Sequence, residues 1–461
     1  MSLSEAASVA RERLFAVIAG VILSVLFVVV LQFSGGSQKA LVVFPLAAVL
    51  LLLAGNFELS LAAMIVCLYV DVHVSFYSSA VALSALLAVS FFVHHRDIAW
   101  KEFANPMTVP ILVYGLCIVP SFLNATQPGM SLLALWNVAA FLIVLYTTFA
   151  ELRTYAAIRR MVALYLAVTC ANGVVAIAQS VLGENRPLGV AGIMYVDYAA
   201  LGICVAVAMS AVSQEKPRKL LMLLAGVIAA ALILSQTRGI WIAASITLAI
   251  LVVYLLVYPE MAGLSRRRII AAATLAALVV AVLGTIAFAL NPRIEQRAME
   301  LTDSRSNDVD QSGPKINSLI TRVFIWDTAR NAFLAHPYVG IGVYAFPYSS
   351  GHYSTLPKVW YTLFVEGNSP HQTHVAVLSE TGVVGMGGYI VFLIAALRSA
   401  FQTIRRSTGI QGKKYGLVAA IGLTYCFVSM GFTDAWLWGQ GIILLGLVMG
   451  MMLANRRISV P

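Results

Sequence analysis

The feature that most constrains this chain is a series of long apolar runs separated by short polar turns. A transmembrane helix needs about 20 apolar residues, and about 17 to 25 are usual. The second and third runs are short enough to form a tilted hairpin, so the chain has about twelve to fourteen spans, and both counts give the later spans the same orientation. The candidate runs lie at 14–33, 40–55, 59–72, 78–93, 107–124, 132–150, 161–182, 198–212, 220–234, 240–258, 269–290, 375–400, 415–431 and 435–454.

The composition excludes a soluble fold. Of the 461 residues, 60% are hydrophobic and only 11% are charged, which is far more apolar than a soluble protein of this length. We therefore predict an all-α integral membrane protein, a polytopic helical bundle with about 12–14 transmembrane helices. The formal net charge of +10 comes from short Lys and Arg clusters between the apolar runs, so we predict contact with membrane lipids and no nucleic-acid partner.

The basic clusters predict how the chain is oriented. Cytoplasmic loops carry an excess of Lys and Arg, and a cytoplasmic N-terminus places every basic cluster on the cytoplasmic side. Both termini are then cytoplasmic, and the opposite side receives turns that are poor in basic residues. The clusters are Arg11/Arg13, Arg96/Lys101, Arg153/Arg159/Arg160, Lys216/Arg218/Lys219, Arg266/Arg267/Arg268, Arg405/Arg406/Lys413/Lys414 and Arg456/Arg457.

One long polar segment divides the chain into an N-terminal transmembrane bundle (1–290), a loop on the outer side of the membrane (291–374) and C-terminal transmembrane helices (375–461). From position 316 the apolar residues of the loop return at helical spacing until His336-Pro337 ends the pattern. We expect an amphipathic helix there, near the membrane surface, and a shorter helix at 293–301. The five cysteines lie inside apolar runs and predict small buried side chains, without a disulfide framework.

Two arginines on the outer side are candidate anion-binding residues. Arg238 lies in the turn 235–239 between two apolar runs, where its bidentate guanidinium suits a phosphate. The alternative is an arginine that anchors the membrane surface. Arg322 lies four residues before Trp326 on one face of the expected amphipathic helix, so the pair is either a second phosphate site or an Arg–Trp stack.

Two histidines precede the apolar run at 375–400. His371 is a candidate general base because the ordinary pKa of an imidazole lies near the working pH. His371 and His374 could instead be metal ligands, although no third ligand stands at a convincing spacing, and a structural role is a further alternative. Glu380, within the same apolar run, is the substitute base if His371 does not act.

Further polar residues are candidates for substrate contact. Arg186 lies in an outer loop with several glycines, which allow close approach of the backbone to an anion. Asp434 lies near the outer end of the last run, where it either balances an arginine or marks the membrane boundary beside aromatic belt residues. With Trp326 and His374, these two residues make up the expected substrate-binding set.

Four of these motifs, taken together and in chain order, are similar to one family. They are Thr237-Arg238-Gly239, Arg322-x-x-x-Trp326, the segment His336-Pro337-Tyr338-Val339-Gly340-Ile341-Gly342, and His371 nine residues before Glu380-Thr381-Gly382. In order and in predicted topology they resemble the O-antigen ligase and polymerase superfamily, from Arg186 to the end of the chain. The resemblance implies a metal-independent, inverting glycosyltransferase without a cofactor, in the bacterial inner membrane, with a periplasmic active site.

The resemblance also implies substrates and residue roles. The donor is O-antigen linked to undecaprenyl pyrophosphate, and the acceptor is a sugar hydroxyl of the lipid A–core. By matching position, His371 corresponds to the general base, and Arg238 and Arg322 correspond to the residues that bind the pyrophosphate. Gln372 stands where the family often has asparagine.

Three other functions compete with an O-antigen ligase. An O-antigen polymerase shares the donor but uses another lipid-linked glycan as acceptor. A protein O-oligosaccharyltransferase of the same superfamily uses a Ser or Thr side chain. A transporter or flippase is expected to carry charged residues within its spans, whereas the charges of this chain cluster outside its apolar runs.

Overall fold

The computed structural model describes residues 104–184, 187–213, 215–261, 265–271, 318–407, 409–434 and 440–459, with isolated stretches between 61 and 87, residue 274, and residues 309–310 and 313–314. The regular structure of these residues is helical apart from two small antiparallel ladders. Strands β1 (His73–Val74) and β2 (Tyr77–Ser78) pair with His73 opposite Ser78, and β3 (Val309–Asp310) pairs with β4 (Gly313–Pro314) with Val309 opposite Pro314.

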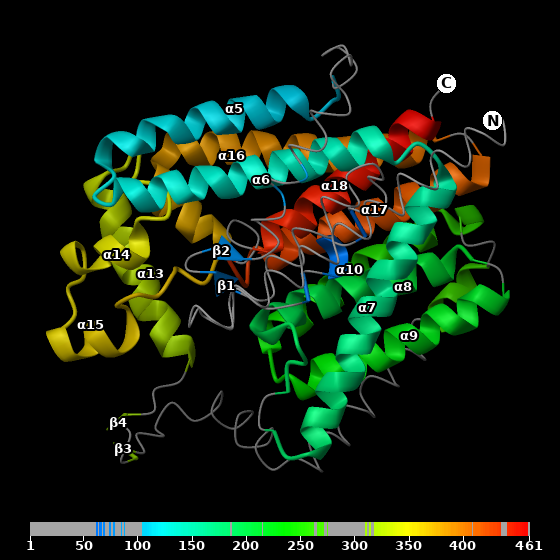
Figure 1. The fold of residues 1–461 in the computed structure, drawn as a ribbon, viewed down its shortest axis with the longest axis horizontal. Helices are drawn as coiled ribbons and strands as arrows, with labels where there is room; N and C mark the ends of the chain where they lie inside the picture. The colour runs from blue at the N-terminus through cyan, green and yellow to red at the C-terminus, as the bar shows by residue number, and fades with distance from the viewer. Residues whose placement is uncertain are drawn as a thin grey trace, which may run out of the picture.

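The helices follow one another through short connections (Figure 1). They are α5 (Thr108–Ile118), η2 (Val119–Asn124), α6 (Pro128–Glu151), α7 (Tyr155–Val181), η3 (Gly192–Met194), α8 (Tyr195–Ala211), α9 (Glu215–Leu234), α10 (Arg238–Val257), η4 (Pro259–Met261), α13 (Ser318–Ala335), α14 (Phe346–Ser349), η5 (Ser350–His352), α15 (Lys358–Phe364), α16 (Thr373–Arg406), α17 (Gly409–Ser429) and α18 (Gln440–Ser459).

Among the described residues, seven helical segments are long and apolar enough to cross a membrane. They belong to α6, α7, α8 with η3, α9, α10, α16 and α18. The prediction of an all-α, polytopic membrane protein is therefore confirmed. The expected runs at 14–33 and 40–55, and most of the runs at 59–72, 78–93 and 269–290, lie outside the described residues, so the total of about 12–14 spans stays a prediction.

Local chemistry sets several helix boundaries. The expected run at 107–124 is divided into α5 and η2, where Pro120 lacks the backbone N–H that an α-helix needs to continue its ladder. Helix α7 begins earlier than the apolar run at 161–182, because the Thr154 side chain accepts a hydrogen bond from the Ala157 N–H at 3.2 Å and caps the first turn. The amphipathic helix expected from position 316 is confirmed as α13.

Helix α8 lies at the centre of the packed bundle. Most of its side chains are buried, and it contacts α7, α9, α10 and α17. Small residues such as Ala199, Ala200 and Gly202 allow these neighbours to approach closely, as is usual between membrane helices. The same applies where α18 meets α6, because a Cβ on Gly450 would lie 2.5 Å from the Cβ of Thr148.

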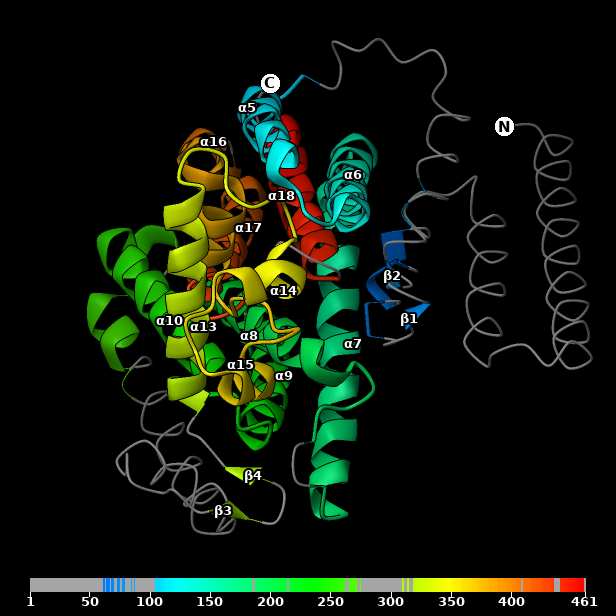
Figure 2. The same cartoon turned by 90° about the vertical axis from the view of Figure 1, so that its left-hand side faces the viewer.

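Helices α13, α14 and α15 gather at one end of α5, α6 and α16 (Figures 1 and 2). Helix α13 runs across that end, at a steep angle to α5, α6 and α16. A small apolar core, separate from the main one, joins these helices to the start of α16. Its buried members are Ile325, Ala329, Ala332, Ile341, Ala345, Phe346 and Val365.

Helix α16 is interrupted at Gly382, whose φ of 63° and ψ of −165° are not helical. The segment 337–342 runs beside this break, and a Cβ on Gly340 would lie only 2.2 Å from the carbonyl carbon of Glu380. We call this place the Gly340–Gly382 crossing. Its backbone hydrogen bonds are Ile341 N–H to Ser379 O (3.2 Å), Gly342 N–H to Glu380 O (3.0 Å), Val383 N–H to Pro337 O (2.9 Å) and Val384 N–H to Tyr338 O (3.2 Å).

Candidate active site

The segment that precedes α16 is fixed to the turn that follows α17. His371 has a left-handed backbone with a φ of 53°, and its N–H donates to Asp434 Oδ2 at 3.2 Å. Two residues later, the Thr373 N–H donates to Met430 O at 3.0 Å, and the Thr373 hydroxyl donates to Thr433 O at 2.8 Å. These bonds hold His371 and Asp434 side by side at the start of α16.

Helix α13 brings Arg322 to the same place. The indole Nε1 of Trp326 donates to Pro370 O at 3.0 Å, which joins α13 to the residue before His371. Arg322, one turn earlier on the same face, is half-buried. Burial lowers the pKa of the Arg322 guanidinium, and the nearby carboxylate of Asp434 opposes that shift.

The surroundings of His371 keep its imidazole neutral at pH 7. Burial lowers the pKa of His371 from its ordinary value, the negative charge of Asp434 opposes this, and the positive charge of Arg322 lowers the pKa further. The net direction is downward. A neutral imidazole is the form that can accept a proton from a hydroxyl.

Arg238 approaches from the opposite side of the bundle, as the first residue of α10. The turn before it contains Gln236 in a left-handed conformation, with a φ of 58°, and is held by the Trp241 indole, which donates to Leu232 O at 3.0 Å. Next to Arg238, Gly239 packs on Phe432, since a Cβ there would lie 3.3 Å from the Phe432 Cβ. The Arg238 turn therefore lies against the segment that ends in Asp434.

Helix α10, helix α13, the start of α16 and the turn after α17 thus converge around Asp434. The sequence of this region can be compared with known families. The O-antigen ligase family model matches residues 220–390. This region belongs to the O-antigen ligase family. It includes Arg238, Arg322 and His371, whereas Asp434 lies beyond its end. A comparison with curated proteins finds no match.

The other predicted residues lie apart from this cluster or outside the described residues. In the O-antigen ligase region, the His374 ring faces Tyr389, with 5.7 Å between ring centroids, so the two histidines have different surroundings. Within the part of the chain that the structure describes, no three His, Cys, Asp or Glu side chains converge on a possible metal position. Arg186 lies outside the described residues.

The structure adds two acidic residues to the neighbourhood of the O-antigen ligase site. Asp197, in the first turn of α8, is buried, receives a hydrogen bond from the Tyr425 hydroxyl at 3.4 Å and lies close enough to Asp434 to interact with it electrostatically. Sequence reasoning missed Asp197, and the available signal was a single acid inside an apolar run. Glu380 is also buried, but both of its oxygens accept backbone N–H groups, from Tyr344 and Phe346.

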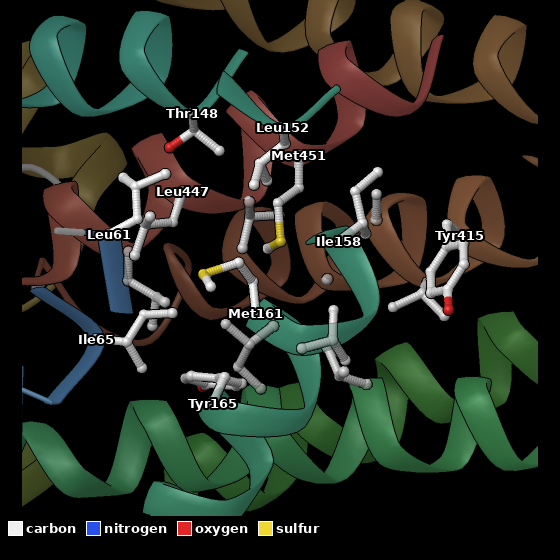
Figure 3. A pocket seen from close by; sticks show the side chains of 18 residues that line it. Leu61, Ile65, Thr148, Leu152, Ile158, Met161, Tyr165, Tyr415, Leu447 and Met451 are labelled. Atoms are coloured by element: carbon white, nitrogen blue, oxygen red, sulfur yellow. The ribbon is translucent and has the colours of Figure 1, made fainter. Parts of the chain in front are cut away.

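Two apolar cavities lie among the helices of this O-antigen ligase family chain. The first, of about 40 Å³, is lined by side chains from α6, α7, α8, α17 and α18, together with Leu61 and Ile65 (Figure 3), and none of the predicted site residues lines it. The second, of about 230 Å³, lies between α5, α6, α16 and α18. Its wall includes Tyr389 and Met430, which contact His374 and Thr373 respectively. The second cavity therefore lies directly beside the candidate active site.

Proposed function

We propose that this protein is an O-antigen ligase. It transfers O-antigen from undecaprenyl pyrophosphate to a sugar hydroxyl of the lipid A–core, at the periplasmic face of the bacterial inner membrane. The observation that carries the proposal is the placement of His371, half-buried, beside Arg322 and Asp434 at the end of the bundle where α13 lies. Membership of residues 220–390 in the O-antigen ligase family supports the reaction class.

In the proposed reaction, His371 is the general base. The acceptor hydroxyl oxygen attacks the anomeric carbon of the donor sugar from the side opposite the pyrophosphate, so the configuration inverts. The bond between that carbon and the pyrophosphate oxygen breaks, and its electron pair leaves with undecaprenyl pyrophosphate. The imidazole takes the hydroxyl proton, for which it must be neutral, and the lowered pKa of His371 supports this.

Arg322 and Arg238 have the complementary task. The departing pyrophosphate gains negative charge, and guanidinium groups that are already in place stabilise it without reorganisation. Arg322 lies beside His371, and the Arg238 turn contacts the segment that carries Asp434. We assign the pyrophosphate to the space between these two arginines, which satisfies the charge of the leaving group.

The second apolar cavity supports a donor that carries a lipid. Its volume of about 230 Å³ and its wall of apolar side chains from α5, α6, α16 and α18 suit a segment of a polyprenyl chain. Because Tyr389 and Met430 connect this wall to the start of α16, a chain there keeps its pyrophosphate near the two arginines.

Deletion of the gene tests the proposal in cells. A ligase deletion removes every polymer-capped lipopolysaccharide species while lipid-linked polymer accumulates. Loss of polymer with single-repeat caps retained would instead identify a polymerase, and intact lipopolysaccharide with a missing protein glycan would identify a protein O-oligosaccharyltransferase. Complementation with wild-type protein but not with His371→Ala links the defect to the site described here.

The purified protein tests the role of His371 directly. His371→Ala should lower ligation by about a hundred- to ten-thousand-fold, the usual contribution of a general base, while binding of the lipid-linked donor persists because both arginines are unchanged. His374→Ala is the matched control, since its ring faces Tyr389. Near wild-type ligation by His371→Ala would disprove the assignment.

A further inference from the structure

The carboxylate of Glu380 holds a loop that does not belong to its own helix. Glu380 lies two residues before the break in α16 and is only 2% exposed. Its Oε2 accepts the Tyr344 N–H at 2.9 Å, and its Oε1 accepts the Phe346 N–H at 3.2 Å. A buried carboxylate is costly unless its oxygens are hydrogen-bonded. The two loop N–H groups therefore stabilise Glu380, and Glu380 in turn fixes the position of the loop.

That loop supports the helix that carries Arg322. The ring of Phe346 is fully buried in the same apolar core as Ile325 and Ala329 of α13. Ile325 lies three residues after Arg322 and directly before Trp326, whose indole reaches Pro370. The path from Glu380 to Arg322 therefore runs through one pair of backbone hydrogen bonds and one packed core.

The Gly340–Gly382 crossing makes this path stiff. Backbone hydrogen bonds join the segment after α13 to α16 on both sides of the break. Asn124 adds a third element, because its side-chain amide donates to Gly340 O at 3.0 Å. Helix α13 therefore cannot shift relative to α16 without breaking several of these bonds.

We propose that Glu380 is a positioning residue, whose buried carboxylate holds the loop of Tyr344 and Phe346 and thereby keeps Arg322 of α13 in register with His371 at the start of α16. The inference rests on the proposed function of Arg322 and His371. Glu380 does not touch the substrate. It acts through Arg322, because a guanidinium fork must meet phosphate oxygens in a defined orientation.

A double-mutant cycle separates positioning from simple structural support. Glu380→Gln replaces one carboxylate oxygen by an amide N–H₂ group, which meets a backbone N–H donor to donor. In the otherwise wild-type protein, this change should lower kcat/KM for a fluorescent undecaprenyl-pyrophosphate glycan by about ten- to a hundredfold, because small displacements of catalytic groups have effects of that size. In an Arg322→Lys background, where the bidentate fork is already lost, it should have little further effect.

Three further measurements accompany the cycle. The acid limb of the pH–rate profile should stay where it is in Glu380→Gln, since His371 and not Glu380 accepts the proton. Glu380→Asp, which keeps two carboxylate oxygens, should restore part of the activity. Ser379→Ala is the matched control, because the Ser379 hydroxyl bonds only to Val375 O and Ala376 O of its own helix, and it should behave as wild type.

Equal losses from Glu380→Gln in both backgrounds, or no loss in either, would overturn the positioning role. If Glu380→Gln does not yield folded protein, the same cycle with Glu380→Asp gives the decision. Retention of full activity by both His371→Ala and Arg322→Lys would instead overturn the proposed function. Loss in those two variants with full activity in Glu380→Gln overturns the positioning role alone.

Discussion

At the scale of single residues, His371 joins two environments that act on its pKa in opposite directions. Burial and Arg322 lower the pKa, and Asp434 opposes them without reversing the shift. The base must be neutral to act, so kcat/KM should rise through an acid limb whose apparent pKa lies below the ordinary value of about 6.5. Ligation rates of the purified protein across the acidic range measure this limb, and a limb above that value would contradict the assignment.

Asp434 gives the same prediction a direction. Because its negative charge favours the protonated imidazole, Asp434→Asn should lower the pKa of His371 further and move the acid limb to lower pH. The asparagine keeps a side-chain oxygen that can accept the His371 N–H, so the backbone conformation is retained. A shift to higher pH in Asp434→Asn would show that Asp434 does not face the titrating group.

The two arginines are tested by a change that keeps charge and removes shape. Lysine is a point charge, whereas a guanidinium binds two phosphate oxygens at once. Arg238→Lys and Arg322→Lys should each lower kcat/KM by about a hundredfold, the usual effect of removing one donor to a developing anion. Arg330→Lys, at an exposed position on the same helix as Arg322, is the control. Full activity in both Lys variants would exclude a pyrophosphate site.

Sequence reasoning could find Arg238, Arg322 and His371 because polar residues next to apolar runs stand out. It could not find their surroundings. Asp197 lies inside an apolar helix, and its proximity to Asp434 depends on how α8 packs against α17. The partners of Glu380 are backbone N–H groups of a distant loop, which no side-chain pattern can encode. Sequence therefore identified Glu380 as a substitute base, whereas its geometry is that of a support.

At the scale of elements, the break in α16 is the feature that the apolar pattern did not predict. The run at 375–400 is continuous in hydrophobicity, but the helix is interrupted at Gly382. The cause is tertiary: the chain after α13 needs backbone partners, and the opened turn of α16 provides them. Glycine permits this because a left-handed φ and a close backbone approach exclude a Cβ at both Gly340 and Gly382.

Gly340→Ala tests the crossing. The added Cβ would lie 2.2 Å from the carbonyl carbon of Glu380, at a φ of 70°, and the left-handed backbone alone disfavours alanine by about 1–2 kcal/mol. We expect a lower thermal midpoint and a loss of ligation. Gly387→Ala is the control in α16, since nothing lies within 4 Å of its Cβ position, and alanine there should stabilise the helix by about 1 kcal/mol. Equal midpoints for the two variants would contradict a tight crossing.

At the scale of the whole molecule, the sequence could predict the fold class and not the packing. Apolar runs indicate where helices lie, because each span must satisfy its own backbone hydrogen bonds in the membrane. They carry no record of which helices touch. The convergence of α10, α13, α16 and the turn after α17 depends on contacts between distant parts of the chain. The division into 1–290, 291–374 and 375–461 likewise stays a prediction of charge and hydropathy.

The orientation of the molecule decides whether the site faces the periplasm. The one-sided basic clusters predict cytoplasmic termini and a periplasmic loop at 291–374. In a variant without its native cysteines, a membrane-impermeant thiol reagent should label Glu366→Cys in intact cells whose outer membrane is permeabilised. Glu366 is exposed, close to the start of α16, and therefore reports the side on which His371 lies.

The matched control for this orientation is Lys413→Cys, at an exposed position near the start of α17. It belongs to a basic cluster and should be labelled only after the inner membrane is lysed. Because α16 separates the two positions, one crossing of the membrane by that helix requires opposite accessibilities. Labelling of Lys413→Cys but not Glu366→Cys in intact cells would place His371, Arg322 and Arg238 in the cytoplasm, where a donor presented at the periplasmic face cannot reach them.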